Sequence, residues 1–294
     1  MLTEKQERLR ALLRSYGSCL VAYSGGGDSA LLAVMAHEAL GNKALAVIAD
    51  SPSLPRRELA EALELGRRFG FAIRVVRSRE FDNPNYVANP LDRCYYCKAE
   101  LFEHMAALAR AEGFAVIAYG ENASDAGDWR PGARAAAQFQ VRAPLKEAGL
   151  TKADIRALSA AMGLPTADKP QMACLSSRVP YGEAVTPAKL AMIEQAENVL
   201  RDLGFREVRV RHHEMGSEGR PAGAGPQHLA RIELGVAEMA RLLGDGTAGR
   251  VAEALRRIGY THVTLDLQGY RRGSLNEPTL GPRPGTTAVG PAAA

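Results

Sequence analysis

The sequence predicts an α/β protein with a doubly wound parallel sheet, followed by a second, smaller α+β domain. Four short runs rich in apolar residues, at 19–24, 44–50, 71–77 and 114–120, are spaced along the first half of the chain. Strands that are buried on both faces have this composition, and a helix after each strand is typical of a parallel sheet covered on two sides. After about residue 182 the pattern changes, which indicates the second domain.

Helical patterns lie between the predicted strands, at 29–40, 57–69 and 98–112. A further helix is expected to begin near Thr151, because Thr151 and Asp154 form a pattern like a capping box. The N-terminal segment MLTEKQERLRALLRSYG is helix-like and charged throughout, so it does not resemble a secretory signal.

The second domain is expected to start with a long helix, with Thr186 as its cap and Pro187 as its first residue. The segment 206–213 then alternates with a period of two, which predicts a strand. The remaining predicted elements are strands at 229–235 and 262–270, with one helix near 236–257 between them.

We therefore expect a first domain over residues 1–182 and a second over 183–277. The final segment, 278–294, has no periodicity and is expected to be disordered. The stretch 214–227 is rich in Gly and Pro and is typical of an inserted loop.

Composition limits the class of protein. Of 294 residues, 46% are apolar and 24% charged, which is typical of a soluble globular chain, and no apolar run approaches the ~20 residues of a membrane span. We expect a cytoplasmic protein. A net charge of +4 suits phosphorylated ligands but is too small to favour nucleic acid. In a reducing compartment, the four cysteines are expected to bind metal, act in catalysis or be inert rather than form disulfides.

The segment VAYSGGGDSALL runs from a strand through a glycine turn into a helix, as phosphate-binding loops do. Two chemistries fit it. Gly25, Gly27 and Ala30 match a dinucleotide fingerprint, with Asp50 as the acid that binds a ribose. The alternative is S-G-G-x-D-S, the pattern of the PP-loop that binds the pyrophosphate of ATP. Asp28 favours this alternative, because its charge would repel pyrophosphate unless Mg²⁺ intervened. The residues expected to bind ATP are Ser24, Gly25, Gly26, Gly27, Asp28, Ser29, Asp50 and Ser51.

Three of the cysteines can act together. Cys94 and Cys97 precede the helix expected from Lys98, where a helix N-terminus would stabilise a thiolate, and Cys174 lies far along the chain. A disulfide, a zinc site completed by another ligand, and a [4Fe–4S] cluster with one open iron all remain possible from the spacing alone. Cys19 lies inside the first strand and is expected to be a buried, inert residue.

Arg209 and Arg211 alternate with Val208 and Val210 in the segment REVRVR. Alternation on a strand puts the two arginines on one face and the valines on the other. Two guanidinium groups on one face are expected to bind a phosphate.

Several segments resemble the LarE-type ATP-dependent sulfur transferases, in order from about residue 4 to 277. They are YSGGGDSALL, NPLDRCYYCKAELF, GENASDAGDWRPGARAA, PLKEAGLTKADIR, DKPQMACLSSRVPYG, GFREVRVRHH and YTHVTLDLQGYRRGSLNE. The resemblance implies the adenine nucleotide alpha hydrolase-like fold. It also implies a role in making the nickel-pincer nucleotide of lactate racemase: activation of a carboxylate of pyridinium-3,5-dicarboxylic acid mononucleotide with ATP and Mg²⁺, followed by replacement of oxygen with sulfur.

The resemblance implies two possible sulfur sources. In one branch of the family, the cysteine that matches Cys174 gives up its own sulfur and becomes dehydroalanine. In the other, Cys94, Cys97 and Cys174 hold a [4Fe–4S] cluster, and a sulfide on the open iron is the donor. Because this chain has all three cysteines, we expect the cluster branch. The resemblance also places Glu197 at the sulfur-transfer site and the substrate phosphate at Arg209 and Arg211.

Other classes of function compete with this one. A tRNA thiolase would need a more basic surface or an RNA-binding segment, an ammonia-using ligase would not need three cysteines, and a nucleotide sensor would bind ATP without releasing pyrophosphate. The expected partners are a small mononucleotide and other copies of this chain, with neither membrane nor nucleic acid. The family resemblance suggests a hexamer, and the sulfide source stays unknown.

Overall fold

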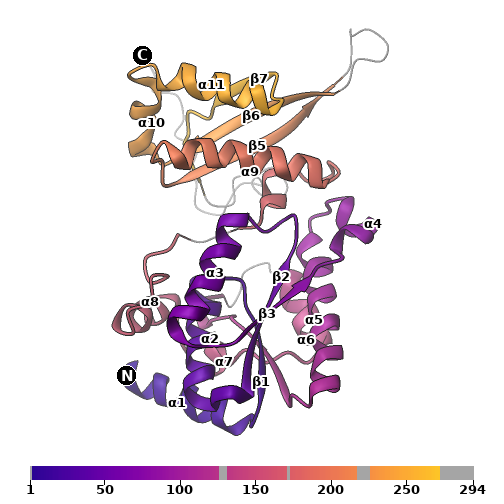
Figure 1. Cartoon of the computed structure of the whole chain (residues 1–294), viewed down its shortest axis with the longest axis vertical. Coiled ribbons are helices and arrows are strands. Elements are labelled where there is room, and N and C mark those ends of the chain that lie inside the picture. Colours follow the sequence, from indigo (N-terminus) through magenta and orange to yellow (C-terminus); the bar gives the residue numbers. More distant parts are fainter. Residues whose placement is uncertain (1, 126–130, 171–172, 217–225, 272–294) are drawn as a thin grey trace, which may run out of the picture. The chain divides into compact units, whose positions relative to one another are not determined.

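The computed structural model describes residues 2–125, 131–170, 173–216 and 226–271 (Figure 1). The chain divides into two compact units, which we call the first and the second unit. The first unit comprises Met1–Ser176 and Ala184–Leu190, and the second comprises Ser177–Glu183 and Ala191–Ala294. The predicted domain boundary after residue 182 lies where the chain passes between the units and stays a prediction. The predicted disordered tail, 278–294, lies outside the described residues.

The first unit is built on a four-stranded parallel sheet in the order β3-β2-β1-β4. The chain runs outward from β1 to β2 and β3, then crosses back to place β4 on the other side of β1. This order confirms the doubly wound sheet predicted from the apolar runs. The strands are β1 (Cys19–Ala22), β2 (Ala44–Asp50), β3 (Ile73–Arg77) and β4 (Val116–Tyr119).

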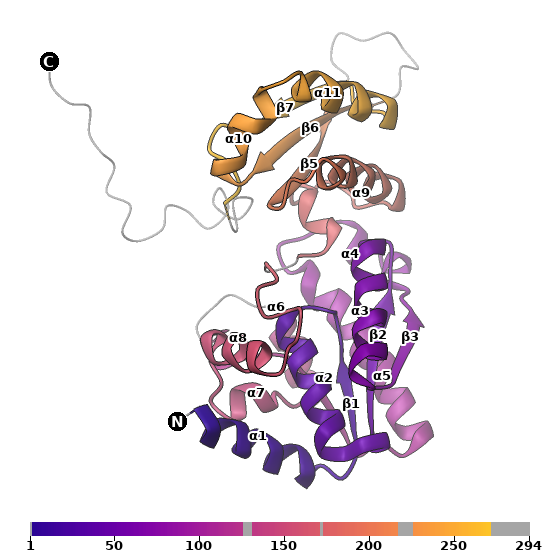
Figure 2. The same cartoon turned by 60° about the vertical axis from the view of Figure 1, so that its left-hand side comes forward.

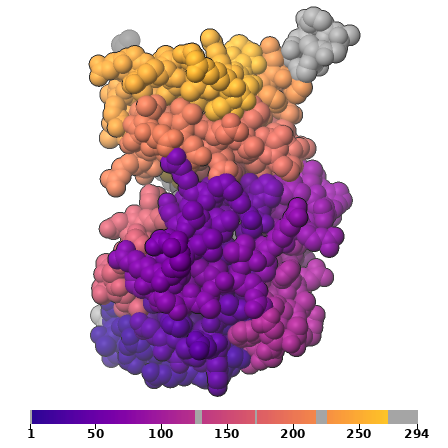
Figure 3. Space-filling model, viewed as in Figure 1, coloured from indigo at the N-terminus to yellow at the C-terminus, as the bar shows by residue number. Residues whose placement is uncertain are grey.

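Helices cover both faces of this sheet, as the two views in Figures 1 and 2 show. Alternate residues of β1 serve the two faces: Val21 packs in a core with helices α1, α2, α3, α7 and α8, and Leu20 in a second core with α5 and α6. In the space-filling view, the purple surface around α3 occupies the centre of the visible face of this unit (Figure 3). The helices are α1 (Leu2–Ser15), α2 (Gly27–Leu40), α3 (Arg56–Phe69), α4 (Pro84–Val87), α5 (Arg93–Glu112), α6 (Pro131–Gln138), α7 (Pro144–Glu147) and α8 (Lys152–Ala161).

The second unit has a three-stranded mixed sheet in the order β5-β6-β7, with β5 antiparallel and β7 parallel to β6. Val208 and Val210 of β5 pack with Leu200 and Val251 from helices in a core of their own, which confirms the small α+β unit. The elements are α9 (Pro187–Asp202), β5 (Val208–Met215), β6 (Gln227–Leu234), α10 (Val236–Leu243), α11 (Thr247–Ile258) and β7 (His262–Leu265).

Two predicted helix starts are confirmed by their caps. Thr151 accepts a hydrogen bond from the backbone of Asp154, and the Asp154 side chain accepts one from Thr151, so a capping box starts α8. The Thr186 hydroxyl accepts a hydrogen bond from the backbone N–H of Lys189 at 3.2 Å, at the start of α9. Both helices therefore begin where the local sequence predicts.

Other boundaries differ from the predictions. The single helix expected near 236–257 is two helices, because Gly244 takes an extended conformation and ends α10, and Asp245 and Gly246 then take positive φ angles of 49° and 69°. The strand expected at 262–270 ends at Leu265, and the helix expected from Lys98 begins at Arg93. The short helices α4, α6 and α7 were not predicted. Within the described ranges, no helix is both long enough and apolar enough to cross a membrane.

Candidate active site

The predicted PP-loop, residues 24–29, joins β1 to α2 at the carboxyl edge of the sheet. The strand order reverses here between β1 and β4, which is where open α/β sheets bind ligands. Ser29 Oγ lies 3.0 Å from Ser24 Oγ, donates to the Gly26 carbonyl at 3.0 Å and accepts from the Ser24 N–H at 3.2 Å. The two serines thus fix the turn. The N-terminus of α2 and its unpaired amides suit an anion at this position.

Two glycines are required by close packing around this loop. Gly25 has a φ of +74°, and a Cβ there would lie 2.9 Å from Ala62 Cβ of α3. A Cβ on Gly120, just after β4, would lie 2.9 Å from the backbone nitrogen of Ser29. The loop is therefore held between α3 and the end of β4, and neither neighbour can move aside without shifting backbone.

Asp28, the predicted Mg²⁺ ligand, points toward two polar residues from other segments. Lys152 Nζ lies 2.5 Å from its Oδ1, and the Asn122 amide donates to its Oδ2 at 3.4 Å. Carboxylate oxygens beside a phosphate loop are suitable ligands for Mg²⁺. Lys152 is a site residue that sequence reasoning missed, since a single lysine at the start of a helix has no distinguishing pattern.

A cavity of about 520 Å³ borders the loop at Gly25, a volume in the range of small-molecule sites. It is lined by residues of α3 and of the segment 165–169: Gly25, Ala60, Glu61, Glu64, Leu65, Arg67, Arg68, Pro165, Thr166 and Lys169.

The other two predicted ATP residues follow β2 at the same edge. Asp50 is paired with Arg56, whose guanidinium lies 2.5 Å from its carboxylate. The hydroxyl of the buried Ser51 donates to Glu80, so its side chain is already hydrogen-bonded within the protein. A nucleotide would therefore meet Ser51 through its backbone, and the nucleotide contacts of both residues stay predictions.

The pair Cys94 and Cys97 lies within the first turns of α5, with Cys94 exposed and Cys97 half buried. Cys174 is also exposed, and its segment is tied to the same part of the first unit. The Leu175 N–H donates to the Ser53 carbonyl at 2.8 Å. The Arg93 guanidinium, next to Cys94 in the chain, donates to the Ser176 carbonyl at 3.1 Å.

A buried hydroxyl cluster strengthens this attachment. The hydroxyls of Ser53, Tyr86 and Ser176 lie 2.6–2.8 Å from one another, and Ser53 Oγ also donates to Glu80 at 2.8 Å. Since Ser53 follows β2, the cluster connects the carboxyl edge of the sheet to the cysteines. Cys174 is thereby held near α5 although it lies far along the chain.

The three thiols interact electrostatically. Burial raises the pKa of Cys97, which is raised further by Glu80, Cys174 and Cys94. Cys94 is exposed at its surface, but the protein packed around it still desolvates the thiol and raises its pKa. Cys174 is the next cause, and Arg93 and Lys98 oppose the shift. Desolvation therefore opposes the thiolate form of both cysteines, and Glu80 opposes that of Cys97. The predicted stabilisation of the thiolates by the helix N-terminus stays a prediction.

These residues fit the donor set of an iron–sulfur cluster. The thiols of Cys94, Cys97 and Cys174 come from two segments and interact electrostatically, and Cys94 and Cys174 are exposed. A cluster cation would hold them as thiolates, although burial raises the pKa values of Cys94 and Cys97. Cys19, by contrast, is fully buried, and burial raises its pKa to about 12, which confirms that it is an inert core residue.

In the second unit, Arg209 and Arg211 share one face of β5, as predicted, and both are buried. Arg211 pairs with Glu233 at 2.7 Å and also donates to the Ser177 carbonyl at 2.8 Å. Arg209 lies over the ring of Tyr270, 5.0 Å from its centroid, and burial lowers its pKa.

Several guanidinium and carboxylate groups of this unit interact around these two arginines. Guanidinium groups gathered on one face suit a bound phosphate. The interacting groups belong to Arg178, Arg201, Arg209, Arg211, Arg231, Glu197, Glu233 and Asp266.

Glu197 is fully buried, so it does not lie on a solvated face of α9. Its carboxylate accepts from Arg178 at 2.8 and 3.1 Å, from Arg201 at 2.7 Å and from the Val210 N–H at 3.1 Å. Burial alone would raise the pKa of Glu197, but Arg178, Arg201 and Arg209 outweigh it and lower the pKa to about 2. A permanently ionised carboxylate suits positioning better than proton transfer; its predicted role in the reaction stays untested.

Comparison with known proteins gives the family. No family model matches the chain. An uncharacterised protein of Synechocystis is 42% identical over 94% of this chain and 98% of its own length. The pyridinium-3,5-bisthiocarboxylic acid mononucleotide synthase of Lactiplantibacillus plantarum is 33% identical over 94% of this chain and 95% of its own length. An uncharacterised protein of Methanocaldococcus jannaschii is 25% identical over 86% of this chain. With the phosphate loop, the cysteines and the arginine face in place, this match over almost the full length shows that the chain belongs to the LarE-type sulfur transferase family.

Proposed function

We propose that the protein inserts sulfur into a precursor of the nickel-pincer nucleotide, using ATP. The single observation that carries the proposal is that the Cys174 segment is hydrogen-bonded to the start of α5, where Cys94 and Cys97 lie, in a unit that also holds a PP-loop at the carboxyl edge of its sheet. The relative from Lactiplantibacillus plantarum is named for making a bisthiocarboxylic acid mononucleotide, which supports the same substrate class.

The first step is activation of a substrate carboxylate. A carboxylate oxygen of pyridinium-3,5-dicarboxylic acid mononucleotide attacks the α-phosphorus of ATP; an O–P bond forms, and the bond to pyrophosphate breaks. The loop amides, Ser24, Ser29 and the N-terminus of α2 would hold the pyrophosphate, and Asp28 would hold Mg²⁺ against it. Lys152, beside Asp28, would neutralise further phosphate charge.

The second step replaces oxygen with sulfur. A sulfur nucleophile attacks the acyl carbon, a C–S bond forms, the C–O bond to AMP breaks, and AMP leaves. Cys94, Cys97 and Cys174 would hold a [4Fe–4S] cluster, which when bound supplies a sulfide on the iron that no cysteine ligates. The exposure of Cys94 and Cys174 supports access of substrate to this place.

The alternative is that Cys174 gives up its own sulfur. In that case its Sγ attacks the acyl carbon, its Cβ–Sγ bond then breaks with loss of a Cα proton, and dehydroalanine remains. Cys94 and Cys97 would then have no part in sulfur transfer. Their position beside Cys174 favours the cluster, because a sacrificial cysteine needs no thiol neighbours.

Anaerobic purification and reconstitution with iron and sulfide test which of the two sulfur sources the protein uses. The protein is expected to bind close to four irons per chain and to make more than one thiocarboxylate per chain when sulfide is supplied. Cys97→Ser should lose the iron and the sulfur transfer, whereas Cys19→Ala, which changes a buried cysteine far from any predicted ligand set, should keep both. A colourless protein that loses the mass of H₂S from Cys174 in one turnover would establish the sacrificial route instead.

The arginine face is proposed to bind the substrate phosphate. Arg209→Met keeps the volume of the buried side chain but removes its charge, and unlike a change at Arg211 it leaves the pair with Glu233 in place. We expect KM for the mononucleotide to rise at least tenfold, with binding of ATP unchanged. Equal weakening of ATP binding would contradict this assignment.

Release of pyrophosphate only when the mononucleotide is present would also separate the proposal from a nucleotide sensor or a tRNA thiolase.

A further inference from the structure

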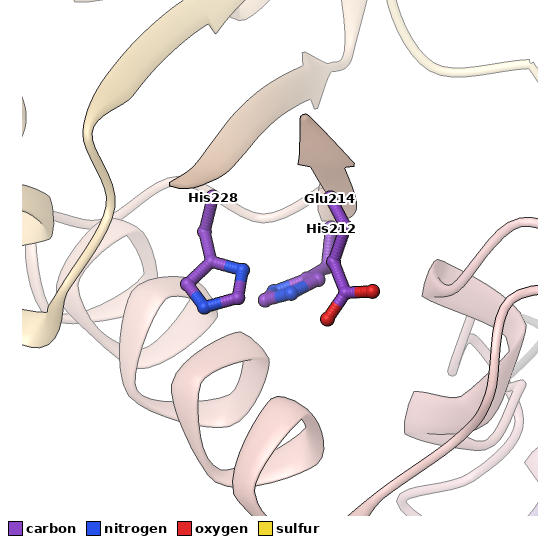
Figure 4. A group of neighbouring side chains, drawn as sticks. All are labelled: His212, Glu214 and His228. Carbon is purple, nitrogen blue, oxygen red and sulfur yellow. The ribbon is translucent and has the colours of Figure 1, made fainter. Parts of the chain in front are cut away.

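Three potential metal ligands meet on one face of the second unit's sheet, away from the arginine face. His212 and Glu214 are two residues apart on β5 and so point to the same side, and His228 lies on β6 opposite Glu214 in the antiparallel register. Figure 4 shows the three side chains gathered on this side. One ligand atom from each lies within 4.8 Å of the others, and in the described ranges no other three His, Cys, Asp or Glu side chains meet so closely.

His212 is held in an orientation that suits ligation. It is fully buried, and its Nδ1 lies 3.2 Å from the hydroxyl of Tyr260. Metal-bound histidines typically use the second ring nitrogen for such a bond, which fixes the ring and leaves the other nitrogen to the metal. Nε2 of His212 is thus the ligand atom that this contact selects.

His228 supplies an independent observation. Its Nδ1 is buried and has no hydrogen-bond partner among the residues that the structure describes. Its ring packs against that of His212, with the centroids 4.7 Å apart. Packing of two histidines in a core would explain why their rings are in contact, but it would leave this ring nitrogen without a partner. A buried polar atom without a partner costs free energy unless another group or an ion satisfies it. A cation between the rings and the Glu214 carboxylate would satisfy it.

We propose that His212, Glu214 and His228 bind a divalent transition-metal ion. Two imidazoles and one carboxylate suit Zn²⁺, Co²⁺, Ni²⁺ or Fe²⁺, whereas Mg²⁺ and Ca²⁺ prefer oxygen ligands alone. Three protein ligands leave a coordination position for water or another small ligand. The ion cross-links β5 to β6. This site uses none of the cysteines and does not depend on the proposed sulfur transfer.

Cobalt(II) titration of the full-length protein tests the site. Nitrogen and oxygen ligands give d–d absorption without the thiolate-to-cobalt charge-transfer bands that a cysteine site gives, so the two sites are distinguishable in one spectrum. Glu214→Gln and His228→Gln are expected to weaken this thiolate-free binding about 100-fold, at least as much as loss of a second-shell partner does. Glu214 is exposed, so this variant is expected to fold. His262→Gln, an exposed histidine on the neighbouring strand, is the matched control and should bind as the wild type does.

Two further measurements sharpen the result. Tyr260→Phe keeps the core filled and removes the hydrogen bond to His212, so it should weaken binding by about 10–100-fold. Zn²⁺ should raise the Tm of the wild type and of His262→Gln but not of His228→Gln, and Mg²⁺ at the same concentration should raise none of them. The proposal would be overturned if the thiolate-free cobalt bands were as strong in His228→Gln as in the wild type. It would also be overturned if Mg²⁺ raised the Tm of the wild type as much as Zn²⁺ does.

Discussion

At the scale of single residues, Glu197 and Arg178 show how a charged pair is made part of a core. Both side chains are fully buried, and the guanidinium contacts the carboxylate through two nitrogens. Arg178 follows Cys174 by four positions in the chain. Its guanidinium donates to Glu197 and to the Ser177 hydroxyl. The pair holds the segment after Cys174 to α9.

The charge of Glu197 should make the stability of the second unit depend on pH. Its pKa falls from 4.5 to about 2 on folding, so the ionised carboxylate contributes stability above pH 4.5, and this contribution is lost as the pH falls toward 2. This difference in the pKa of Glu197 corresponds to about 3 kcal/mol of unfolding free energy. Glu197→Gln should cost about 3–5 kcal/mol at pH 7, because Arg178 loses its buried partner.

Urea unfolding at a series of pH values measures this effect. The difference between wild type and Glu197→Gln should shrink as the pH falls from 4.5 toward 2. Glu253→Gln, which removes an exposed partner of Arg257 on α11, should change stability by less than about 1 kcal/mol at any pH. A difference for Glu197→Gln that is constant between pH 7 and pH 2.5 would show that the carboxylate is not held as an anion.

At the scale of elements, the nucleotide loop is shaped by what packs against it. The end of β4 touches the start of α2 so closely that Gly120 has no room for a side chain. Gly120→Ala should therefore push the backbone near Ser29, cost about 1–3 kcal/mol and raise KM for ATP. Gly249→Ala is the control, because a Cβ there meets nothing within 4 Å and Ala is the better helix former. Thermal unfolding and pyrophosphate release measure both; an unchanged KM in Gly120→Ala would mean that the loop does not bind ATP.

Elements that follow from local patterns could be predicted from the sequence, whereas features that depend on contacts between distant residues could not. The strands, the PP-loop and the alternation of Arg209 with Val208 are local patterns, so they were predictable, and the parallel sheet follows from the strand and helix order. Glu80 and Lys152 were missed because they act through contacts with residues far along the chain. The break between α10 and α11 was missed because apolar spacing continues on both sides of Gly244, and the positive φ angles that follow override it.

At the scale of the whole molecule, the predicted sites are divided between two units with separate cores. The PP-loop and the cysteines belong to the first, and the arginine face and the histidine cluster belong to the second. ATP and the substrate phosphate are thus expected to engage different units. A ligand that binds only the native form of one unit stabilises that unit by mass action.

Scanning calorimetry of the full chain tests this division. Since each unit buries its own core, each is expected to unfold in its own cooperative transition. ATP with Mg²⁺ should raise the Tm of one transition, and Gly120→Ala, which lies in the first unit, should lower the Tm of that same transition. Glu197→Gln, in the second unit, should lower the other. If ATP shifted the transition that Glu197→Gln lowers and left the Gly120→Ala transition unchanged, the nucleotide would bind the second unit, and the PP-loop assignment would be wrong.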